Sequence, residues 1–332
     1  MNLRCFLLFA LFPFSLSILP QDPWSLERCI QHALDNNIMI KQQALTVESS
    51  ESSLKQSKLG MLPNLNASGN QQLYFGRTIN PYSFETSEDN RRTNSFSVNS
   101  SVTLFQGLQK YNTMRAYEYS LKANVMNVEK EKNNISLNIA ASYMQILYNE
   151  ELVKVSQNQL ELSKQQAARM QKLVDAGKKP AGDLLDIQSQ LAQDELTLVN
   201  AINQLQQSYL TLTQLLELKT YEGFAIVKPD ESALNTSVFL DSMNFIVDEA
   251  MNYLPDVKAA EYQTEAYRKS YQAARGYQSP SLTLNSGYGT YYSNRLAYNI
   301  ISGGVVTGQY YPTFSDQLSD NRNFSMVFTL SI

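Results

Sequence analysis

Met61-Leu-Pro-Asn-Leu-Asn-Ala-Ser-Gly69 and Gln278-Ser-Pro-Ser-Leu-Thr-Leu-Asn-Ser286 each place one proline between a helical pattern and an alternating pattern. The two prolines, Pro63 and Pro280, occupy the same place in a segment that occurs twice, because residues 24–69 recur without a gap 217 positions later. A proline that ends a helix and opens a strand changes the local architecture. Its occurrence twice at one offset indicates an internal duplication. The two halves are therefore predicted to build equivalent parts of one object.

Period-two alternation follows each proline and predicts four antiparallel strands, over residues 64–76, 94–105, 281–292 and 322–332. Each has an apolar face, which includes Leu104, and a face of small hydroxyl and amide side chains with almost no charge. This is typical of a transmembrane barrel strand, although a half-buried soluble sheet gives the same alternation. Because four strands cannot close a barrel, closure is expected to require other copies of the chain.

The rest of the chain is mainly helical in pattern, which predicts a mixed fold with more α than β structure. Residues 24–61 are predicted to form one helix with Ile38 on its apolar face, and residues 107–217 a long helical hairpin. Apolar side chains recur every seven positions on both arms of the hairpin, which is typical of two supercoiled helices. A second stripe of smaller side chains on the first arm indicates close packing against a neighbouring helix.

The N-terminus has the pattern of a secretory signal. Arg4 precedes an apolar run that is too short to span a membrane as a helix, so residues 1–20 are predicted to be a signal peptide. The first structural repeat then covers residues 21–241, with a connecting segment at 218–241. The second repeat, residues 242–332, is incomplete because it stops in the strand that should lead into its own hairpin.

Composition excludes several classes of function. Lysine and arginine total 27 against 31 acidic residues, a net charge of -4, so no basic face for nucleic acid is expected. One histidine, His32, cannot supply a histidine metal cluster, and no phosphate loop, nucleophile elbow or zinc spacing occurs. We therefore expect no catalytic, cofactor-binding or metal site, and no enzyme.

A compact turn separates the two arms of the predicted hairpin. Glycine and proline fix a tight reversal there, two lysines place charge at a helix C-terminus, and Asp183 can cap the next helix. A hairpin turn with caps explains all of these residues without any further role. The turn consists of Gly177, Lys178, Lys179, Pro180, Ala181, Gly182, Asp183 and Leu184.

Several segments resemble the TolC-like outer-membrane efflux proteins, in the right order along the chain. Residues 24–37, from Trp-Ser-Leu-Glu to Asp-Asn-Asn, resemble the opening helix of that family, and residues 175–193 resemble its hairpin tip. Pro63-Asn-Leu65 is similar to the helix-to-barrel entry, and Leu104-Phe-Gln-Gly107 to the barrel exit. Gly107, Pro63 and Pro280 are accordingly the expected helix-to-barrel junctions. The resemblance covers nearly everything after the signal.

The resemblance implies a homotrimer in which each chain adds four strands to one barrel in the lipid of the outer membrane, with a periplasmic tunnel of coiled-coil helices. It implies a passive exit duct of a tripartite efflux or type I secretion system, served by an inner-membrane pump and a periplasmic adaptor (membrane fusion) protein. By the same resemblance, the turn at 177–184 is the adaptor-docking and gating tip, where Asp183 helps to hold the closed end through partners on neighbouring hairpins.

The chain departs from the family pattern in its incomplete second repeat. We expect either that this is a fragment or truncated product of a longer chain, or that the partner sequence is encoded elsewhere. In both cases the chain by itself is not expected to form a sealed tunnel. A periplasmic coiled-coil scaffold or adaptor with a small β-domain is the alternative. It accounts for the heptads and the signal, but poorly for the uncharged strand faces and the duplicated proline.

Overall fold

The computed structural model describes residues 23–79, 86–220, 223–228 and 242–332. The predicted signal peptide and most of the predicted connecting segment lie outside the described residues. The chain divides into two units, which are described separately. The helical unit comprises Met1–Gln43 with Val128–Asp248, and the sheet unit comprises Ala44–Asn127 with Glu249–Ile332.

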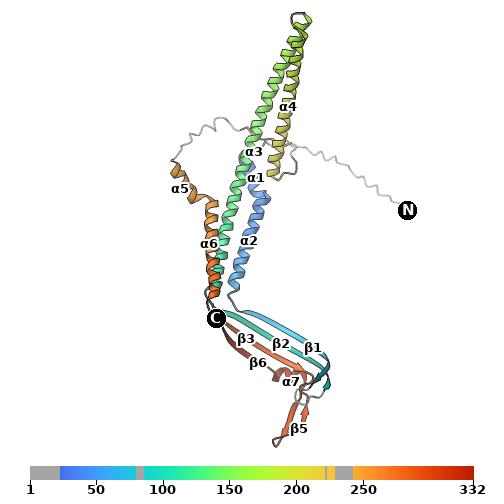
Figure 1. The fold of residues 1–332 in the computed structure, drawn as a ribbon, viewed down its shortest axis with the longest axis vertical. Coiled ribbons are helices and arrows are strands. Elements are labelled where there is room, and N and C mark those ends of the chain that lie inside the picture. Colours follow the sequence, from blue (N-terminus) through green and yellow to red (C-terminus); the bar gives the residue numbers. More distant parts are fainter. Residues whose placement is uncertain (1–22, 80–85, 221–222, 229–241) are drawn as a thin grey trace, which may run out of the picture. The chain divides into compact units, whose positions relative to one another are not determined.

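The predicted fold class is confirmed: long helices dominate, and the strands are antiparallel (Figure 1). The long helices are α3 (Gln109–Asp175) and α4 (Ala181–Leu215), and the strands of the main sheet are β1 (Asn64–Ile79), β2 (Thr86–Gln106), β3 (Ser281–Ser293) and β6 (Asn323–Ser331). Among the described residues, no helix combines the length and the apolar character that crossing a membrane requires.

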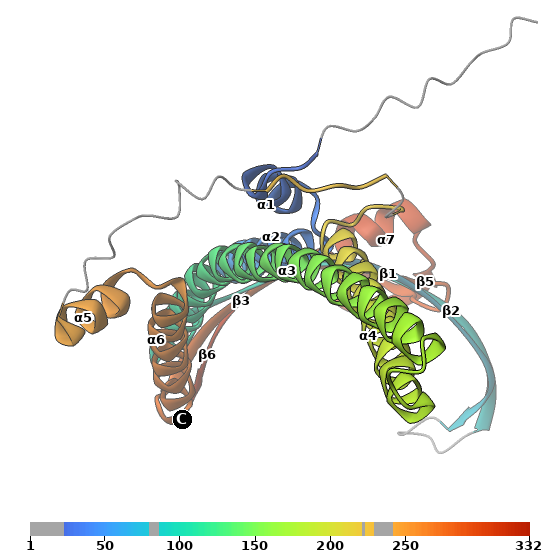
Figure 2. The same ribbon diagram turned by 90° about the horizontal axis from the view of Figure 1, so that it is seen from above.

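In the helical unit, α3 and α4 pack along a seven-residue repeat, and Figures 1 and 2 show the two arms side by side. Ile139 and Ile146 of α3 and Leu212 of α4 are fully buried, as the repeat predicts. The second, more polar stripe of α3 is buried as well, and Asn149 donates to the Gln204 carbonyl of α4 at 3.3 Å. That stripe was expected to pack against a neighbouring helix outside the hairpin. It faces α4 instead, in the seam of the hairpin.

A short helix, α1 (Leu26–Asn36), completes the core of the helical unit. Trp24 donates its backbone N–H to the Ala225 carbonyl at 2.8 Å, and Val227 donates back to Trp24 at 3.0 Å. The buried hydroxyl of Tyr143 on α3 donates to the carbonyl of Trp24 at 3.1 Å and is also hydrogen bonded to the carbonyl of Val227. One phenol therefore ties two chain segments to the long helix.

The predicted single helix over residues 24–61 is wrong, because Asn37 interrupts it. α1 ends at Asn36 and α2 (Ile38–Leu59) begins two residues later, with Asn37 at ψ 131°. The Asn37 side chain accepts from the N–H of Met39 at 2.9 Å and donates to the Leu215 carbonyl at 3.4 Å. Asparagine can replace lost helix hydrogen bonds in this way. The break changes the buried face, so Ile38 is 59% exposed and Ile40 is buried.

The second repeat contains the same break at the same offset. α5 (Met243–Tyr253) and α6 (Pro255–Arg275) are separated by Leu254, which lies 217 positions after Asn37. Here Pro255 opens the second helix, where a missing N–H costs nothing. The starts of β1 and β3 are also 217 positions apart. Different residues thus produce the same helix break in the two repeats.

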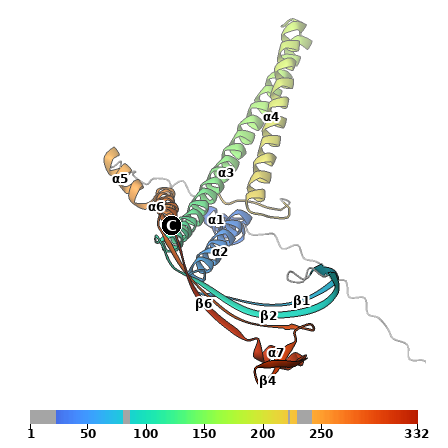
Figure 3. The same cartoon turned by 60° about the horizontal axis from the view of Figure 1, so that its bottom comes forward.

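The main sheet has the order β1-β2-β3-β6, and its register gathers the apolar side chains on one face. Leu65, Phe96, Tyr288 and Phe324 belong to this face and are 42–75% exposed. The opposite face carries the small polar residues, for example Ser68 hydrogen bonded to Ser97 at 2.8 Å. The period-two pattern therefore produces a two-sided sheet, which Figure 3 shows as strongly curved.

The strands depart from the predicted bounds at three places. β1 and β2 continue through most of the segment 76–93, which was expected to be a loop, because backbone pairing does not require apolar side chains. A bulge between Thr103 and Phe105 removes Leu104 from the pairing, and Phe105 instead pairs with Leu282. Between β3 and β6 lie a hairpin, formed by β4 (Tyr298–Ser302) and β5 (Val305–Tyr310), and the helix α7 (Phe314–Asp320), none of which was predicted from the sequence.

The C-terminus of α4 carries backbone strain that a substitution can remove. Glu217 has φ +57°, while its N–H donates to Gln214 and that of Leu218 to Thr213, the bonding pattern of a Schellman motif in which glycine is preferred. We expect Glu217→Gly to raise the free energy of unfolding by about 0.5–1 kcal/mol, because the left-handed strain outweighs the added chain entropy. Gln207→Gly, on an exposed site inside α4, should lower it by about 1 kcal/mol. Urea unfolding would show both, and a lower midpoint for Glu217→Gly would contradict this account.

Candidate functional site

The predicted hairpin tip is a tight turn between α3 and α4. Gly177 has φ +69°, its N–H donates to Val174 at 2.9 Å, and Lys178 donates to Leu173 at 2.9 Å. These are the two hydrogen bonds of a Schellman motif with glycine in its left-handed position. A Cβ on Gly177 would meet no atom within 4 Å, so the backbone angle alone explains the glycine.

The structure places the charged tip residues on the surface and changes the expected role of Asp183. The N-cap of α4 is Pro180, and no side chain caps this helix end. Asp183 lies in the first turn of α4, where a carboxylate stabilises the helix dipole, and it pairs with Lys179 at 3.3 Å. Lys178 and Lys179 are exposed. The turn therefore presents mainly positive charge to solvent.

A buried carboxylate, which was not among the predicted site residues, lies farther along the seam between α3 and α4. Asp194 of α4 is 8% exposed and accepts hydrogen bonds from Ser163 and from Gln190, the latter at 2.9 Å. The bond from Ser163 holds the pKa of Asp194 below its ordinary value, while burial acts in the opposite direction. A polar residue in a coiled-coil core fixes the register of the helices. The same seven-residue spacing that buries Ala201 and Ser208 could have identified it.

In the sheet unit, the junctions between helices and strands meet at glycine residues. Gly107 has φ +53°, and a Cβ there would lie 2.6 Å from Ser279 Oγ and 2.7 Å from the Gly276 carbonyl. Leu108 follows at φ +58°, so two consecutive left-handed residues turn β2 into α3. The structure thus brings Gly107 next to the segment that precedes Pro280. Such close backbone contact requires glycine.

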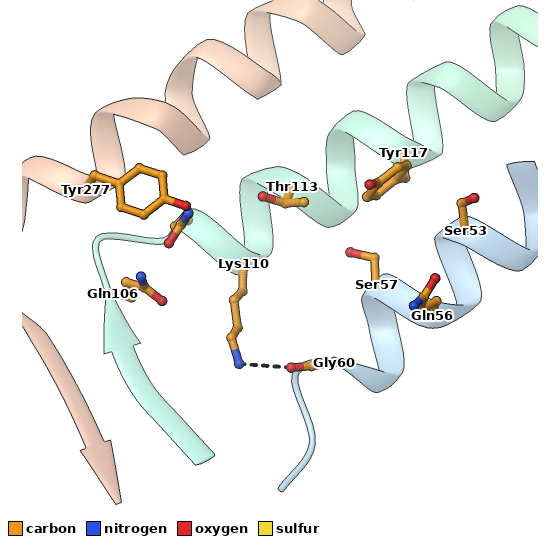
Figure 4. Close-up of a pocket in the computed structure, with 10 residues that line it drawn as sticks. Ser53, Gln56, Ser57, Gly60, Gln106, Lys110, Thr113, Tyr117 and Tyr277 are labelled. Atoms are coloured by element: carbon orange, nitrogen blue, oxygen red, sulfur yellow. Dashed lines mark hydrogen bonds between the residues drawn. The ribbon is translucent and has the colours of Figure 1, made fainter. Parts of the chain in front are cut away.

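The remaining junction residue, Pro63, follows Gly60, which lines a polar groove (Figure 4). Pro63 immediately precedes β1, and three residues earlier the Gly60 carbonyl accepts from Lys110 Nζ at 2.9 Å. The groove has a volume of about 500 Å³ and is lined by α2, α3 and the 3-10 turn after α6. Its lining is almost entirely uncharged and polar: Ser53, Gln56, Ser57, Gly60, Gln106, Gln109, Lys110, Thr113, Tyr117 and Tyr277.

The groups that could carry chemistry have structural partners. The ring of His32 packs at 5.1 Å from that of Trp24, and its Nδ1 lies 3.4 Å from the Asn36 amide. Burial raises the pKa of the Cys29 thiol to about 11, which leaves it unreactive at neutral pH. Within the described ranges, no three His, Cys, Asp or Glu side chains gather to hold a metal ion.

Comparison with known families decides the assignment. Residues 29–217, more than half of the chain, match the model of the outer membrane efflux protein family. The chain belongs to the outer membrane efflux protein family. The predicted resemblance is therefore confirmed, and the family places the chain in the outer membrane with a periplasmic helical extension. Comparison with curated protein sequences gives no match.

Solved outer-membrane channels share the fold. CusC superposes with a TM-score of 0.74 at 18% identity, covering 92% of this chain and 65% of CusC. CmeC of Campylobacter jejuni gives a TM-score of 0.74 at 16% identity, covering 92% of this chain and 61% of CmeC. The open state of MtrE from Neisseria gonorrhoeae gives 0.66 at 16% identity, covering 92% and 63%. The chain thus spans less than two thirds of the length of these channels.

The close contact at Gly107 predicts a strong effect of a single methyl group. Gly107→Ala should lower the free energy of unfolding by about 2–4 kcal/mol, because it adds left-handed strain and a clash with Ser279 and Gly276. Gly177→Ala should cost only about 1 kcal/mol, since it has the same strain without a clash. Equilibrium denaturation in detergent would compare the two. Equal losses would contradict the close packing at Gly107.

The buried carboxylate predicts a pH-dependent contribution to stability. Because the pKa of Asp194 is lowered in the folded state, its contribution is present above the ordinary pKa and is lost as pH falls through the folded value. Asp194→Asn should lower the melting temperature at neutral pH and weaken the loss of stability below about pH 4. Asp186→Asn, at an exposed site on α4, is the control and should change neither. Identical acid unfolding of Asp194→Asn and the unmodified protein would be the contrary result.

Proposed function

We propose that the chain is the outer-membrane channel component of a tripartite efflux or type I secretion system. In this role it is a passive exit duct for substrates that an inner-membrane pump and a periplasmic adaptor deliver. One observation carries the proposal: one face of the four-stranded sheet is mainly apolar and largely exposed, and the opposite face carries mainly small, uncharged polar side chains. Such a sheet suits lipid on one side and an aqueous lumen on the other.

The two edges of the sheet support a homotrimer. β1 and β6 are the edge strands of the order β1-β2-β3-β6, and an open edge cannot face lipid because its backbone groups need partners. If β1 of one copy pairs with β6 of the next, the backbone N–H and C=O groups of both edges gain hydrogen-bond partners. Three copies would supply twelve strands, enough for a closed barrel. CmeC and MtrE, which share the fold, are outer membrane channels, and this supports the proposed channel role.

The tip of the hairpin is the proposed docking site for the adaptor. The turn at Gly177–Leu184 is exposed and rigidly bonded, and it presents Lys178 and Lys179 to solvent. Asp183 already pairs with Lys179 inside the turn, so a latch to a neighbouring hairpin would have to compete with that ion pair. An exposed surface pair is weak enough, below about 1 kcal/mol, to be exchanged in this way.

A periplasmic scaffold fits the structure less well. It would leave the apolar sheet face in water, including Phe75, Phe328 and Leu330 at 62–74% exposure. Contiguous apolar surface of this extent marks a protein or membrane contact. The channel role therefore accounts for more of the molecule.

Disulfide cross-linking between edge strands tests the assembly. Ser68→Cys on the polar face of β1 would be combined in turn with Asn323→Cys, Ser325→Cys and Thr329→Cys on the same face of β6. We expect at least one combination to give a covalent trimer in outer-membrane fractions, because each β1 then lies beside the β6 of the next copy.

The control combines Ser68→Cys with Asn285→Cys, which lies on the same face of the inner strand β3. This pair should stay monomeric on a non-reducing gel. Absence of intermolecular disulfides from every β6 combination, in protein that reaches the membrane, would contradict closure through β1 and β6.

A further inference from the structure

The segment between β3 and β6 forms a structured excursion from the sheet. We call β4 and β5 together, residues 298–310, the rim hairpin. Gly303 and Gly304 join its strands at φ +62° and +84°, the angles of a type I′ turn. The ring of Tyr298 lies 5.6 Å from that of Tyr310 across the strands. Figure 3 shows β4 and α7 at the end of the sheet away from the helix-to-strand junctions.

The helix α7 anchors this excursion to the apolar side of the sheet. Gln317 is 1% exposed and bonds both backbone groups of Ser293, at 2.9 and 3.1 Å. Thr290 donates to the Leu318 carbonyl at 2.8 Å, and the ring of Tyr292 lies 4.9 Å from that of Phe314. Since Thr290 pairs with Phe96, it belongs to the apolar face. α7 therefore covers the outer end of the face that the channel role assigns to lipid.

The rim hairpin itself is apolar, uncharged and exposed. No acidic or basic residue occurs between Leu296 and Ser315. The exposed apolar side chains cluster on both sides of the glycine turn: Ile300 47%, Ile301 66%, Val305 65%, Val306 55% and Tyr311 63%. A solvated extracellular loop does not require such a surface. Aliphatic side chains flanked by tyrosines are typical of the interface between a bilayer and water.

Three arginines lie at the base of the excursion. Arg92 lies over the Tyr292 ring, with Cζ 5.7 Å from its centroid, and its backbone accepts from Asn294 next to Arg295. Arg322 follows α7 and donates to the Ser319 carbonyl at 2.6 Å. In the described part of the chain, none of the three forms an ion pair with a carboxylate. Four acids are near these arginines in sequence: Glu88 and Asp89 precede Arg92, and Asp316 and Asp320 precede Arg322. The Asp316 carboxylate accepts a hydrogen bond from the Thr313 hydroxyl at 2.6 Å.

We propose that this rim binds anionic, phosphate-bearing lipid of the outer leaflet. The rim hairpin lies in the interfacial layer of that leaflet, and Arg92, Arg295 and Arg322, here called the rim arginines, bind lipid phosphates. Arginine suits this role because its planar guanidinium binds phosphate in a bidentate manner, and the strands and their connections contain no lysine. The inference rests on the proposed function, since it requires the sheet to span a membrane.

A fluorescent probe on the rim hairpin tests the inference. The full chain with Ser302→Cys, labelled with an environment-sensitive dye, would be inserted into phosphatidylcholine vesicles containing a trace of spin-labelled lipid. The other thiol in the described residues, Cys29, is fully buried and does not compete for the label. We expect headgroup-labelled phosphatidylglycerol to quench the dye more strongly than headgroup-labelled phosphatidylcholine. Each rim arginine should contribute about fivefold in apparent lipid affinity.

Adjacent arginines on opposite faces provide a matched control. Arg92→Gln, Arg295→Gln and Arg322→Gln together should abolish the preference for phosphatidylglycerol. Arg91→Gln should retain it, because Arg91 lies on the polar face over Tyr74.

The outcomes separate the inference from the proposed function. A dye that neither lipid quenches, in protein that floats with the vesicles, would overturn the inference alone. Equal quenching by the two lipids, or equal loss in Arg91→Gln and the triple variant, would also overturn it. Protein that does not float with vesicles at all would contradict the proposed function, and the inference with it.

Discussion

Backbone hydrogen bonding at the edges of the main sheet is the constraint on which the rest of the structure depends. The order β1-β2-β3-β6 pairs three strand interfaces, and among the described residues one side of β1 and one side of β6 has no strand partner. In water such edges invite aggregation, and in lipid each unpaired group costs several kcal/mol. Exposure of the apolar face of the sheet to water is unfavourable as well. Assembly with other copies would remove both costs, and this is the physical reason for the proposed oligomer.

At the junctions the sequence changes from the 3.6-residue period of a helix to the two-residue period of a strand, or back. A helix buries side chains every 3.6 residues and a strand every second residue, so the chain must change direction sharply between them. α2 ends at Leu59 and α6 at Arg275, and Pro63 and Pro280 immediately precede β1 and β3. Gly107 and Leu108 turn β2 into α3 through left-handed backbone. The strain at Leu108 persists because the contacts around Gly107 and Gly276 hold the turn. These contacts fix where the strands end and the long helix starts.

Much of this architecture could be predicted because repetition amplifies weak local signals. Pro63 and Pro280 were informative as a pair. Alternation alone assigned side chains on all four strands to the correct face, except at Leu104, where a bulge shifts the register. The break at Asn37 was missed because asparagine does not forbid a helix, although Pro255 marks the equivalent break in the second repeat. The rim hairpin was missed despite Gly303-Gly304 between apolar residues, which is a hairpin signal.

The details of the site depended on contacts that the sequence does not contain. A heptad pattern assigns Asp194 to the seam of the hairpin, but only the facing helix shows that Ser163 and Gln190 satisfy its carboxylate. Gly107 was identified as a junction residue, whereas its contact with Ser279 joins positions far apart in the chain. Contacts between residues far apart in the chain depend on the topology of the fold. The sequence therefore predicts where such a residue lies, but not which residues it contacts.

The measurement that tests the central claim most directly is the mass of the native assembly. Outer membranes would be extracted with a mild detergent and the intact particle measured by native mass spectrometry. Closure of the sheet by other copies predicts a particle of three chains that requires detergent to stay in solution. A single chain that remains soluble in periplasmic extracts without detergent would contradict it.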